Sequence, residues 1–456
     1  MNWQQGQRVE IDVTDLTDSG DGVGRVEQQV VFVPDTVPGD RVEVRLVRVK
    51  PQYAHGKVQQ LLQASPHRIR PACIVADKCG GCQWQHIRYD YQLDAKRNLV
   101  VQALQRIGGL VEPPVEPTLR AGDALGYRNK ATFPLSRSVQ GQVQAGYYQK
   151  GSHHLINLNQ CPIQDQRLNP LLAEVKQDIQ QRGWAIYSEQ HHRGRVRHLS
   201  LRVGRRTGEL LLTLVVKDWS LVGAEEQAQA WLERYPGLVG VCLNWNGDRT
   251  NAIFGEETRC LAGRSYLAEE FAGLTFHIQP TTFFQVNTET AEALLQVIQA
   301  ELQLQGQETL VDAYCGIGTL SLPLARQVQQ VIGLEEQLNS VALARSNAAL
   351  NQITNAEFHL GPVEDLLPAL GSTPDVVLLD PPRKGCDRTV LEALRSRPVS
   401  RLAYVSCNPA TLARDLKILC EDGLYQLTKV QPADFFPQTA HVECAAFLRS
   451  SPPVPG

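Results

Sequence analysis

Short apolar segments alternate with helical stretches from residue 288 towards the end of the chain, and this alternation restricts the fold more than any other feature. A helix expected at 288–302 is followed by candidate strands at 309–313, 331–334, 375–379 and 401–405. Strands and helices that alternate in this way form a parallel, doubly wound sheet. We therefore predict a Rossmann-like α/β domain over residues 276–450.

The first part of the chain has a different pattern. Residues 7–62 alternate apolar and polar positions in short runs broken by glycine and proline turns, which is typical of a small antiparallel barrel. A helical segment near 88–108 and a proline-containing linker follow. A chain of 456 residues is too long for one ordinary core. We expect three domains, at residues 1–64 (an OB-like β-barrel), 65–275 (mixed, with a cysteine cluster) and 276–450 (α/β).

Positive charge is concentrated in two regions although the net charge is only -3. Residues 41–70 contain seven Lys and Arg against Glu43 alone. Residues 120–210 contain fourteen Lys and Arg against six Asp and Glu, with a run of arginines between 193 and 206. Basic patches attract phosphates by releasing condensed counterions, so these regions predict RNA binding; a solvated basic face is the alternative.

The composition restricts the class of protein and its location. Hydrophobic residues make up 43% of the chain, but no stretch approaches the ~18 apolar residues of a membrane span. The first residues do not resemble a secretory signal. We expect a cytoplasmic protein with no membrane partner and no need for an oligomer beyond the monomer. Eleven cysteines in such a chain favour thiolate chemistry or metal ligation over disulfides.

A glycine turn after the first strand of the α/β domain predicts a nucleoside site. Residues 310–318 run from an apolar strand through Tyr314 into Gly316 and Gly318, and Glu335 ends the next strand, where a carboxylate can accept both ribose hydroxyls. A nicotinamide-binding G-x-G-x-x-G motif would need glycine where the chain has Ser321. The missing glycine favours S-adenosylmethionine, which has a ribose but no phosphate.

Asp380 follows the next long strand and is predicted to face the same crevice, because the carboxyl ends of parallel strands line the ligand site. Pro381 and Pro382 come next, and Arg383 stands where enzymes that methylate base amino groups carry an aromatic residue. This substitution counts against methylation of an amine.

Cys407 ends the following strand in a polar turn, before a helix expected to start near Thr411. A lone cysteine is usually a small buried hydrophobe, but a thiolate here would gain from the helix end and from partial exposure. A thiolate that adds to C6 of a uracil creates an enolate that can accept a methyl group at C5, and a base must then remove the C5 hydrogen. Glu443 supplies a carboxylate, although its spacing alone indicates a surface strand residue.

Three cysteines stand close together, Cys73, Cys79 and Cys82, with Cys161 far downstream as a candidate fourth ligand. Four thiolates suit zinc or an iron-sulfur cluster, and the spacing leaves both open. Radical and sulfur-inserting enzymes usually carry Cys-x3-Cys-x2-Cys, and the five-residue first gap here disfavours that class.

Together these motifs resemble the bacterial RNA uracil-5-methyltransferases, especially the 23S ribosomal RNA branch, over nearly the whole chain. The matching segments are Cys73–Cys82, Phe283-Phe284-Gln285-Val286-Asn287, Asp312–Gly318, Asp380–Arg383, Ser406–Pro409 and His441–Glu443. Residues 1–64 resemble a TRAM domain, a barrel found in RNA-modifying enzymes.

The resemblance implies a class I methyltransferase fold and a role for each site residue. Cys407 would be the nucleophile and Glu443 the proton acceptor. S-adenosylmethionine would be bound by Gln285, Tyr314, Glu335 and Asp380, and a 4Fe-4S cluster by Cys73, Cys79, Cys82 and Cys161. The partner would be 23S ribosomal RNA rather than DNA.

Two alternatives remain open at this point. One is the same reaction on transfer RNA. The other is a noncatalytic iron-sulfur RNA-binding protein that retains a decayed methyltransferase fold. The presence of Cys407, Glu443, Glu335 and Asp380 weighs against decay.

Overall fold

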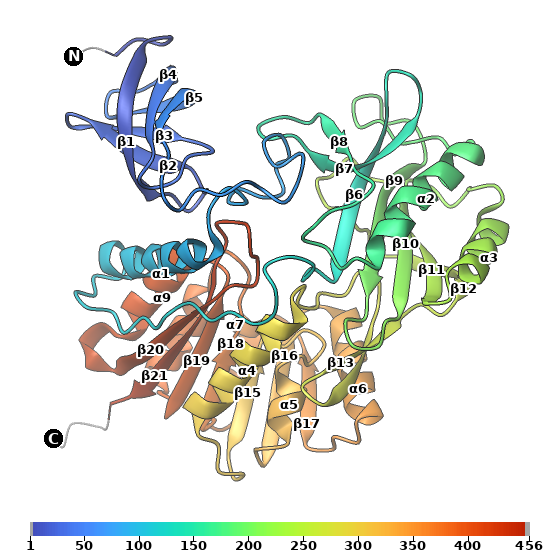
Figure 1. The fold of residues 1–456 in the computed structure, drawn as a ribbon. Coiled ribbons are helices and arrows are strands. Elements are labelled where there is room, and N and C mark those ends of the chain that lie inside the picture. The colour runs from blue at the N-terminus through green and yellow to red at the C-terminus, as the bar shows by residue number, and fades with distance from the viewer. Residues whose placement is uncertain (1–2, 452–456) are drawn as a thin grey trace.

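The N-terminal part of the protein is a closed barrel (Figure 1). The computed structural model describes residues 3–451. The barrel strands follow the order β1-β2-β3-β5-β4, with apolar residues such as Val31, Val33 and Val44 filling the interior. Their bounds are β1 Arg8–Leu16, β2 Gly22–Val26, β3 Gln29–Val33, β4 Arg41–Val49 and β5 Tyr53–Gln63.

A long helix, α1 (Tyr89–Arg106), lies below the barrel and packs against α9 (Pro409–Leu419) of the C-terminal part (Figure 1). Its buried residues Val100 and Leu104 join a core cluster of the C-terminal sheet. On the same helix the fully buried Lys96 forms an ion pair with the fully buried Asp434, at 2.5 Å between Nζ and Oδ1.

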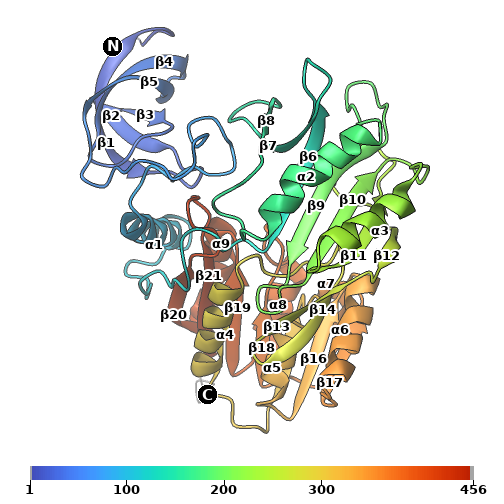
Figure 2. The same ribbon diagram turned by 45° about the vertical axis from the view of Figure 1, so that its right-hand side comes forward.

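The central part is a seven-stranded sheet in the order β12-β11-β10-β9-β6-β7-β8, with α2 and α3 packed on one face (Figure 2). Alternate residues of β9, such as Leu199 and Leu201, pack in the core beneath these helices. The bounds are β6 Lys130–Arg137, β7 Val143–Tyr148, β8 Leu155–Asn157, α2 Leu168–Gln181, β9 Val196–Val203, β10 Leu210–Val216, α3 Ala224–Arg234, β11 Leu238–Trp245 and β12 Thr258–Gly263. A hairpin, β13 (Leu267–Phe271) and β14 (Leu274–Ile278), leads to the C-terminal part.

The C-terminal part is the doubly wound sheet, in the order β17-β16-β15-β18-β19-β21-β20. The first five strands in this order are parallel to one another, whereas β21 is antiparallel to both β19 and β20. Helices cover both faces, so successive strand residues alternate between two cores: Leu310 belongs to one and Val311 to the other.

The strands of this sheet are β15 Thr309–Ala313, β16 Gln330–Glu335, β17 Ala356–Leu360, β18 Val376–Leu379, β19 Arg401–Ser406, β20 Tyr425–Ala433 and β21 Glu443–Ser450. The helices, besides α9, are α4 Thr288–Leu302, α5 Ser321–Ala325, α6 Leu338–Leu350, α7 Val363–Leu366, α8 Arg388–Ser396 and the 3-10 turn η1 Glu421–Gly423. The predicted fold class is therefore confirmed: an α/β sheet follows a mixed central part and an N-terminal barrel.

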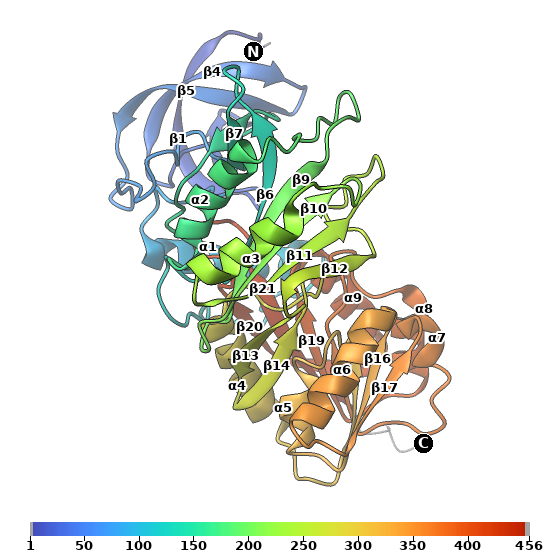
Figure 3. The ribbon, with the colours of Figure 1, turned by 90° about the vertical axis from the view of Figure 1, so that its right-hand side faces the viewer.

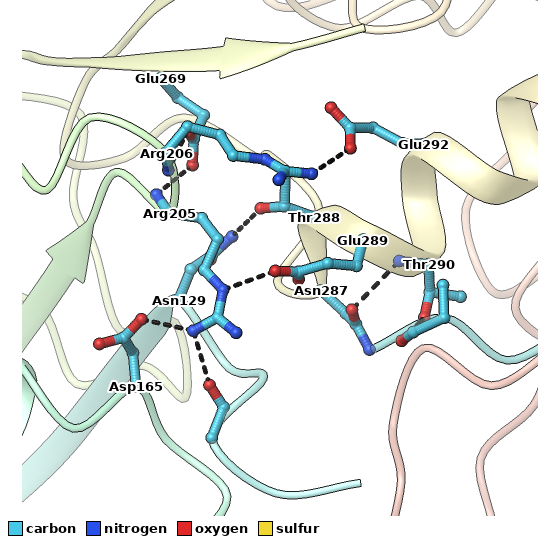
Figure 4. Close-up of polar contacts among 12 residues, drawn as sticks. Asn129, Asp165, Arg205, Arg206, Glu269, Asn287, Thr288, Glu289, Thr290 and Glu292 are labelled. Atoms are coloured by element: carbon cyan, nitrogen blue, oxygen red, sulfur yellow. Dashed lines mark hydrogen bonds and ion pairs between the residues drawn. The ribbon is translucent and has the colours of Figure 1, made fainter. Parts of the chain in front are cut away.

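A polar network joins the central sheet to the start of α4 (Figure 4). Figure 3 shows the central sheet above α4 in the side view. Arg205 donates to Glu289 at 2.7 Å and to Asp165 at 2.6 Å, and Arg206 pairs with Glu292. Asn129 Nδ2 donates to the Gln285 carbonyl at 3.0 Å and to Thr288 Oγ1 at 3.0 Å. The loop before α4, which carries Gln285, is thereby fixed to the central part.

For four of its six arginines, the structure corrects the prediction that the run at 193–206 forms an RNA-binding patch, whereas Arg193 is exposed and Arg195 partly exposed. Besides the ion-paired Arg205 and Arg206, Arg197 is buried and donates to Asn246, and Arg202 is buried with one donor bonded to the Thr282 carbonyl. These four side chains lie in the interior or at the domain junction. The sequence shows how many charges a segment has but not the direction in which each side chain points.

No helix within residues 3–451 is both long and apolar enough to cross a lipid bilayer.

Replacing Lys96 by Ala is expected to lower the thermal unfolding midpoint by roughly 6–20 °C, because an unpaired buried carboxylate costs about 3–5 kcal/mol. A double variant, Lys96→Met with Asp434→Leu, should recover most of the loss since neither charge remains. Circular dichroism on heating measures both. A single variant as stable as the wild type would show that the pair does not hold α1 in place.

Candidate active site

One edge of the C-terminal sheet gathers the polar residues expected at the site, because its parallel strands all end there. Tyr314 follows β15, Glu335 ends β16, Asp380 follows β18 and Cys407 follows β19. The reversed strand β21 begins at the same edge with Glu443. Ser406 is paired with Cys444, so the next residue of each strand, Cys407 and Glu443, meet across the β19–β21 junction.

The turn after β15 has a constrained backbone. Tyr314 adopts a positive φ of 71°, which is uncommon for a residue with a side chain, and Gly318 has a φ of 83°. The backbone N–H groups of Tyr314 and Cys315 both donate to the Leu334 carbonyl, at 2.9 and 3.1 Å. These bonds hold the turn against the end of β16.

A pocket lies beside this turn and contains three of the four residues expected to bind S-adenosylmethionine. Its lining includes Gln285, Asp312, Tyr314, Thr319, Asp380 and Phe435. The fourth residue, Glu335, accepts hydrogen bonds from the backbone N–H groups of Gly316, at 3.0 Å, and Gln337, at 2.8 Å. These bonds fix its carboxylate at the end of β16 next to the glycine turn.

Buried carboxyl groups dominate the electrostatics of the site. Burial raises the pKa of Asp380 to about 7. Burial also raises the pKa of Asp312 to about 7; a hydrogen bond from Ser321 opposes this rise, and the nearby Asp380 and Glu335 add to it. The pKa of Glu443 rises to about 8 through burial and the nearby Asp380, although Arg383 opposes this. A bound cation would favour the ionised form of all three groups.

Cys407 is half-buried, and its pKa is raised from the ordinary thiol value. Burial is the main cause, Glu443 adds to it, and the Arg383 guanidinium opposes it. The sequence predicted a thiolate favoured by the following helix. The first two positions of α9 offer that thiolate little, since Pro409 has no N–H and the Ala410 N–H already donates to Asn408 Oδ1 at 3.0 Å.

Cys407 also opens onto a groove of about 830 Å³ between the barrel and α1. Residues of β1–β3 and of α1 line it, together with Arg383, Cys407 and Asn408. The thiol therefore faces a space that is open to a large substrate, whereas Asp380 faces the smaller pocket.

Two residues of the site, Arg383 near the thiol and Asp312 in the smaller pocket, were not predicted as site residues. Arg383 entered the sequence argument only against amine methylation, yet its charge acts on both Cys407 and Glu443. Asp312 lines the pocket and is fully enclosed. The sequence did carry a signal for both residues. Arg383 closely follows a predicted strand and Asp312 lies near the end of another, so both were expected near the edge where these strands end.

The four cysteines of the expected cluster converge between the segment that follows the barrel and the segment after β8. Cys79, Cys82 and Cys161 are buried and Cys73 is partly buried, and all four are free thiols. Burial, with contributions from the other thiols, raises the pKa of Cys82 to about 11 and of Cys161 to about 12. Among residues 3–451, however, no three Cys, His, Asp or Glu side chains are arranged to hold a single metal ion.

Comparison with known proteins agrees with this geometry. The profile of the family described as "tRNA (Uracil-5-)-methyltransferase" matches residues 258–373 and 370–451, and that of the TRAM domain matches residues 2–59. An uncharacterized RNA methyltransferase of Nostoc sp. is 69% identical over 98% of this chain and 97% of its own. One from Bacillus cereus is 39% identical over 98% of both chains.

The chain belongs to the RNA uracil-5-methyltransferase family. A solved structure, the tRNA (uracil-54, C5)-methyltransferase of Pyrococcus abyssi in complex with S-adenosyl-L-homocysteine, is similar with a TM-score of 0.77 and 26% identity. The similarity covers 96% of this chain and 100% of that one. The predicted class, an S-adenosylmethionine-dependent RNA uracil-5-methyltransferase with a TRAM barrel, is thus confirmed.

Replacing Glu443 by Gln is expected to raise the thermal midpoint of this methyltransferase at about pH 8–9 and to change it little near pH 5. A carboxyl whose pKa rises from 4.5 to about 8 on folding favours the folded state while protonated, and that stability is lost as the pH rises through this range. The amide of the Glu443→Gln variant does not ionise, so the variant keeps this stability at high pH. Thermal unfolding across the range measures the difference, and an advantage that does not grow with pH would contradict the assignment.

Proposed function

We propose that this chain methylates C5 of a specific uridine in 23S ribosomal RNA, with Cys407 as the covalent nucleophile and Glu443 as the base. The observation that carries the proposal is the register of β19 and β21, which brings the thiol and the carboxyl together at the open edge of the sheet. The groove beside Cys407 gives a flipped-out base access to the thiol.

The proposed reaction begins when the Cys407 thiolate adds to C6 of the uracil and moves the electron pair of the C5–C6 bond towards C5. C5 then forms a bond to the methyl carbon of S-adenosylmethionine, whose sulfur leaves with the former bonding pair. Glu443 accepts the proton from C5, the C5–C6 double bond re-forms and the thiolate is expelled. Each step balances without an oxidant or reductant.

The raised pKa values fit this order of events. In the free protein Cys407 and Glu443 both favour their protonated forms. A sulfonium cation beside Asp380 would lower the pKa of these groups and make the thiolate and the carboxylate available together. The nucleophile is then most reactive when the methyl donor is present.

For the methyl donor we propose a site made by Gln285, Tyr314, Glu335 and Asp380. Glu335 is anchored by two backbone N–H groups and retains acceptor capacity for the ribose hydroxyls. Asp380 and Gln285 line the pocket, where the buried carboxyl groups favour a positively charged ligand over a neutral one. Either residue can also form hydrogen bonds with the polar edge of the uracil ring.

Replacing Cys407 by Ala is expected to lower turnover by more than about a thousandfold and to abolish a denaturation-stable adduct with RNA containing 5-fluorouridine. The adduct persists in the wild type because fluorine cannot leave as a proton. The matched control is Cys444→Ala, since Cys444 lies on the neighbouring strand and is fully buried. An adduct in the Cys407 variant, detected by gel shift after denaturation, would overturn the assignment of the nucleophile.

The same trap separates the enzyme from the alternative of a noncatalytic iron-sulfur RNA-binding protein, which would bind RNA without forming any adduct. Glu443→Gln is expected to slow turnover about 10²–10⁴-fold and to accumulate the covalent complex even on ordinary RNA. Turnover of this variant at the wild-type rate would exclude Glu443 as the base.

Transfer RNA is the second candidate substrate, and the similarity to the Pyrococcus abyssi transfer RNA enzyme favours it. The proposal of ribosomal RNA rests on the combination of a TRAM barrel with four cysteines, which resembles the 23S branch. Mapping 5-methyluridine in both RNAs from a deletion strain decides between them. Loss from 23S RNA alone is the expected result, and loss from transfer RNA alone would reverse the assignment.

We also propose that Cys73, Cys79, Cys82 and Cys161 hold a 4Fe-4S cluster. Four neighbouring free thiols form a suitable donor set, and a cluster of four irons spreads its ligands farther apart than one ion does. The cluster would link the segment that contains Cys73, Cys79 and Cys82 to the segment that contains Cys161, and would thereby stabilise the domain at residues 65–275. We further propose that the chain divides into three domains at residues 64 and 275. We propose in addition that the protein is a monomer located in the cytoplasm.

Protein purified without oxygen is expected to be brown, with broad visible absorption and about four irons per chain. Cys161→Ser should lose both, whereas Cys260→Ser, at an exposed cysteine outside the cluster, should keep them. Metal analysis with visible spectroscopy measures this. Colourless wild-type protein containing one zinc would refute the cluster.

A further inference from the structure

The outer face of the barrel carries a cluster of three aromatic rings. Phe32 on β3 lies 5.8 Å from Tyr53 and 5.5 Å from His55 between ring centroids, and the two β5 residues lie 5.6 Å apart. Their chain neighbours, such as Val31 and Ala54, fill the barrel interior. Because side chains alternate along a strand, the three rings lie on the outside, where each is only partly buried.

The rings stand in two rows of paired residues that cross the barrel surface. In one row Val23 pairs with Phe32, Phe32 with His55, and His55 with Arg48. In the other row Arg25 pairs with Val30 and Val30 with Tyr53. Arg25 and Arg48 are both exposed, so a basic side chain stands at the end of each aromatic row.

This surface is continuous with the groove that reaches Cys407. Its lining includes barrel residues Val23, Arg25, Val30 and Phe32, α1 residues Leu99, Ala103 and Arg106, and also Arg383 and Cys407. The volume of about 830 Å³ lies within the range of about 300–1,000 Å³ typical of ligand pockets. It can hold a short unpaired segment.

Acidic groups also border the surface and limit where phosphates can lie. Asp15 and Asp18 line the groove, and Asp15 accepts hydrogen bonds from the Leu16 N–H at 2.8 Å and from Gln102 Nε2 at 3.0 Å. Asp21 lies near His55. Phosphates are therefore expected beside Arg25 and Arg48, with the bases turned towards the rings.

We propose that Phe32, supported by Tyr53 and His55, stacks an unpaired RNA base next to the target uridine, while Arg25 and Arg48 contact the adjoining phosphates. The inference rests on the proposed function, in that the target uridine is the one presented to Cys407. Aromatic rings combined with basic side chains are the usual means of binding single-stranded nucleic acid, and every base has a face that can stack. A target uridine flanked by an unpaired nucleotide is therefore preferred over one in a continuous helix.

The test is methyl transfer to an RNA fragment containing the target uridine, using the full chain. Phe32→Leu keeps an apolar side chain but removes the flat ring, and is expected to raise KM for RNA roughly 5- to 150-fold, the range that base stacking supplies, with kcat at saturating RNA almost unchanged. Phe32→Trp should restore KM. Val47→Ala, at an exposed apolar barrel residue outside the groove, is the matched control.

A fluorescent probe reports the stacking itself. RNA with 2-aminopurine beside the target uridine should be quenched on binding to the wild type and to Phe32→Trp, and not on binding to Phe32→Leu. An unchanged KM together with unchanged quenching in Phe32→Leu would overturn the inference, and so would equal losses in Leu and Trp variants whose thermal midpoints match the wild type.

Failure of the proposed function gives a different result. In that case the wild type itself forms no adduct with RNA containing 5-fluorouridine. If Phe32 acts only in stacking, Phe32→Leu still forms the Cys407 adduct once RNA is saturating.

Discussion

The antiparallel pairing of β21 with β19 is the constraint on which the site depends. Parallel strands alone would bring Asp380 and Cys407 to one edge, as in any doubly wound sheet. Only a reversed strand starts where the others end, and its register places Glu443 beside Cys407. A slip of one residue would turn the Glu443 side chain to the opposite face of the sheet, so the register is as important as the identity of the residue.

Ionisation of the buried carboxyl groups at the site is energetically unfavourable. Asp312, Asp380 and Glu443 are enclosed, Arg383 is a nearby basic group for Glu443 alone, and the raised pKa values of the three carboxyl groups express the cost of ionising them there. Well-packed surroundings offset this cost. The Lys96–Asp434 pair holds α1 on the sheet, and Arg205 with Asn129 holds the Gln285 loop to the central part. Rigid elements thus maintain an acidic pocket that a cationic methyl donor would stabilise.

Much of this architecture could be predicted from the sequence, and the failures have physical reasons. The periodic strands and the residues that end them were predicted because local pattern decides both. The location of Glu443 could not be derived, because strand reversal and register depend on long-range pairing. Its side chain is buried, whereas spacing alone indicated a surface residue. Arg205 of the run at 193–206 was misinterpreted because its charge can be read locally in the sequence, whereas its distant partners Asp165 and Glu289 cannot.

The central claim is that Cys407 and Glu443 act in succession on one uracil ring. Single-turnover methylation of RNA labelled with tritium at C5 of uridine tests it most directly. The account predicts that the wild type releases one tritium to water for each methyl group incorporated, and that in Glu443→Gln methyl incorporation runs ahead of tritium release. Methylated wild-type product that retains its tritium, or a Glu443 variant in which both processes keep the same pace, would contradict it.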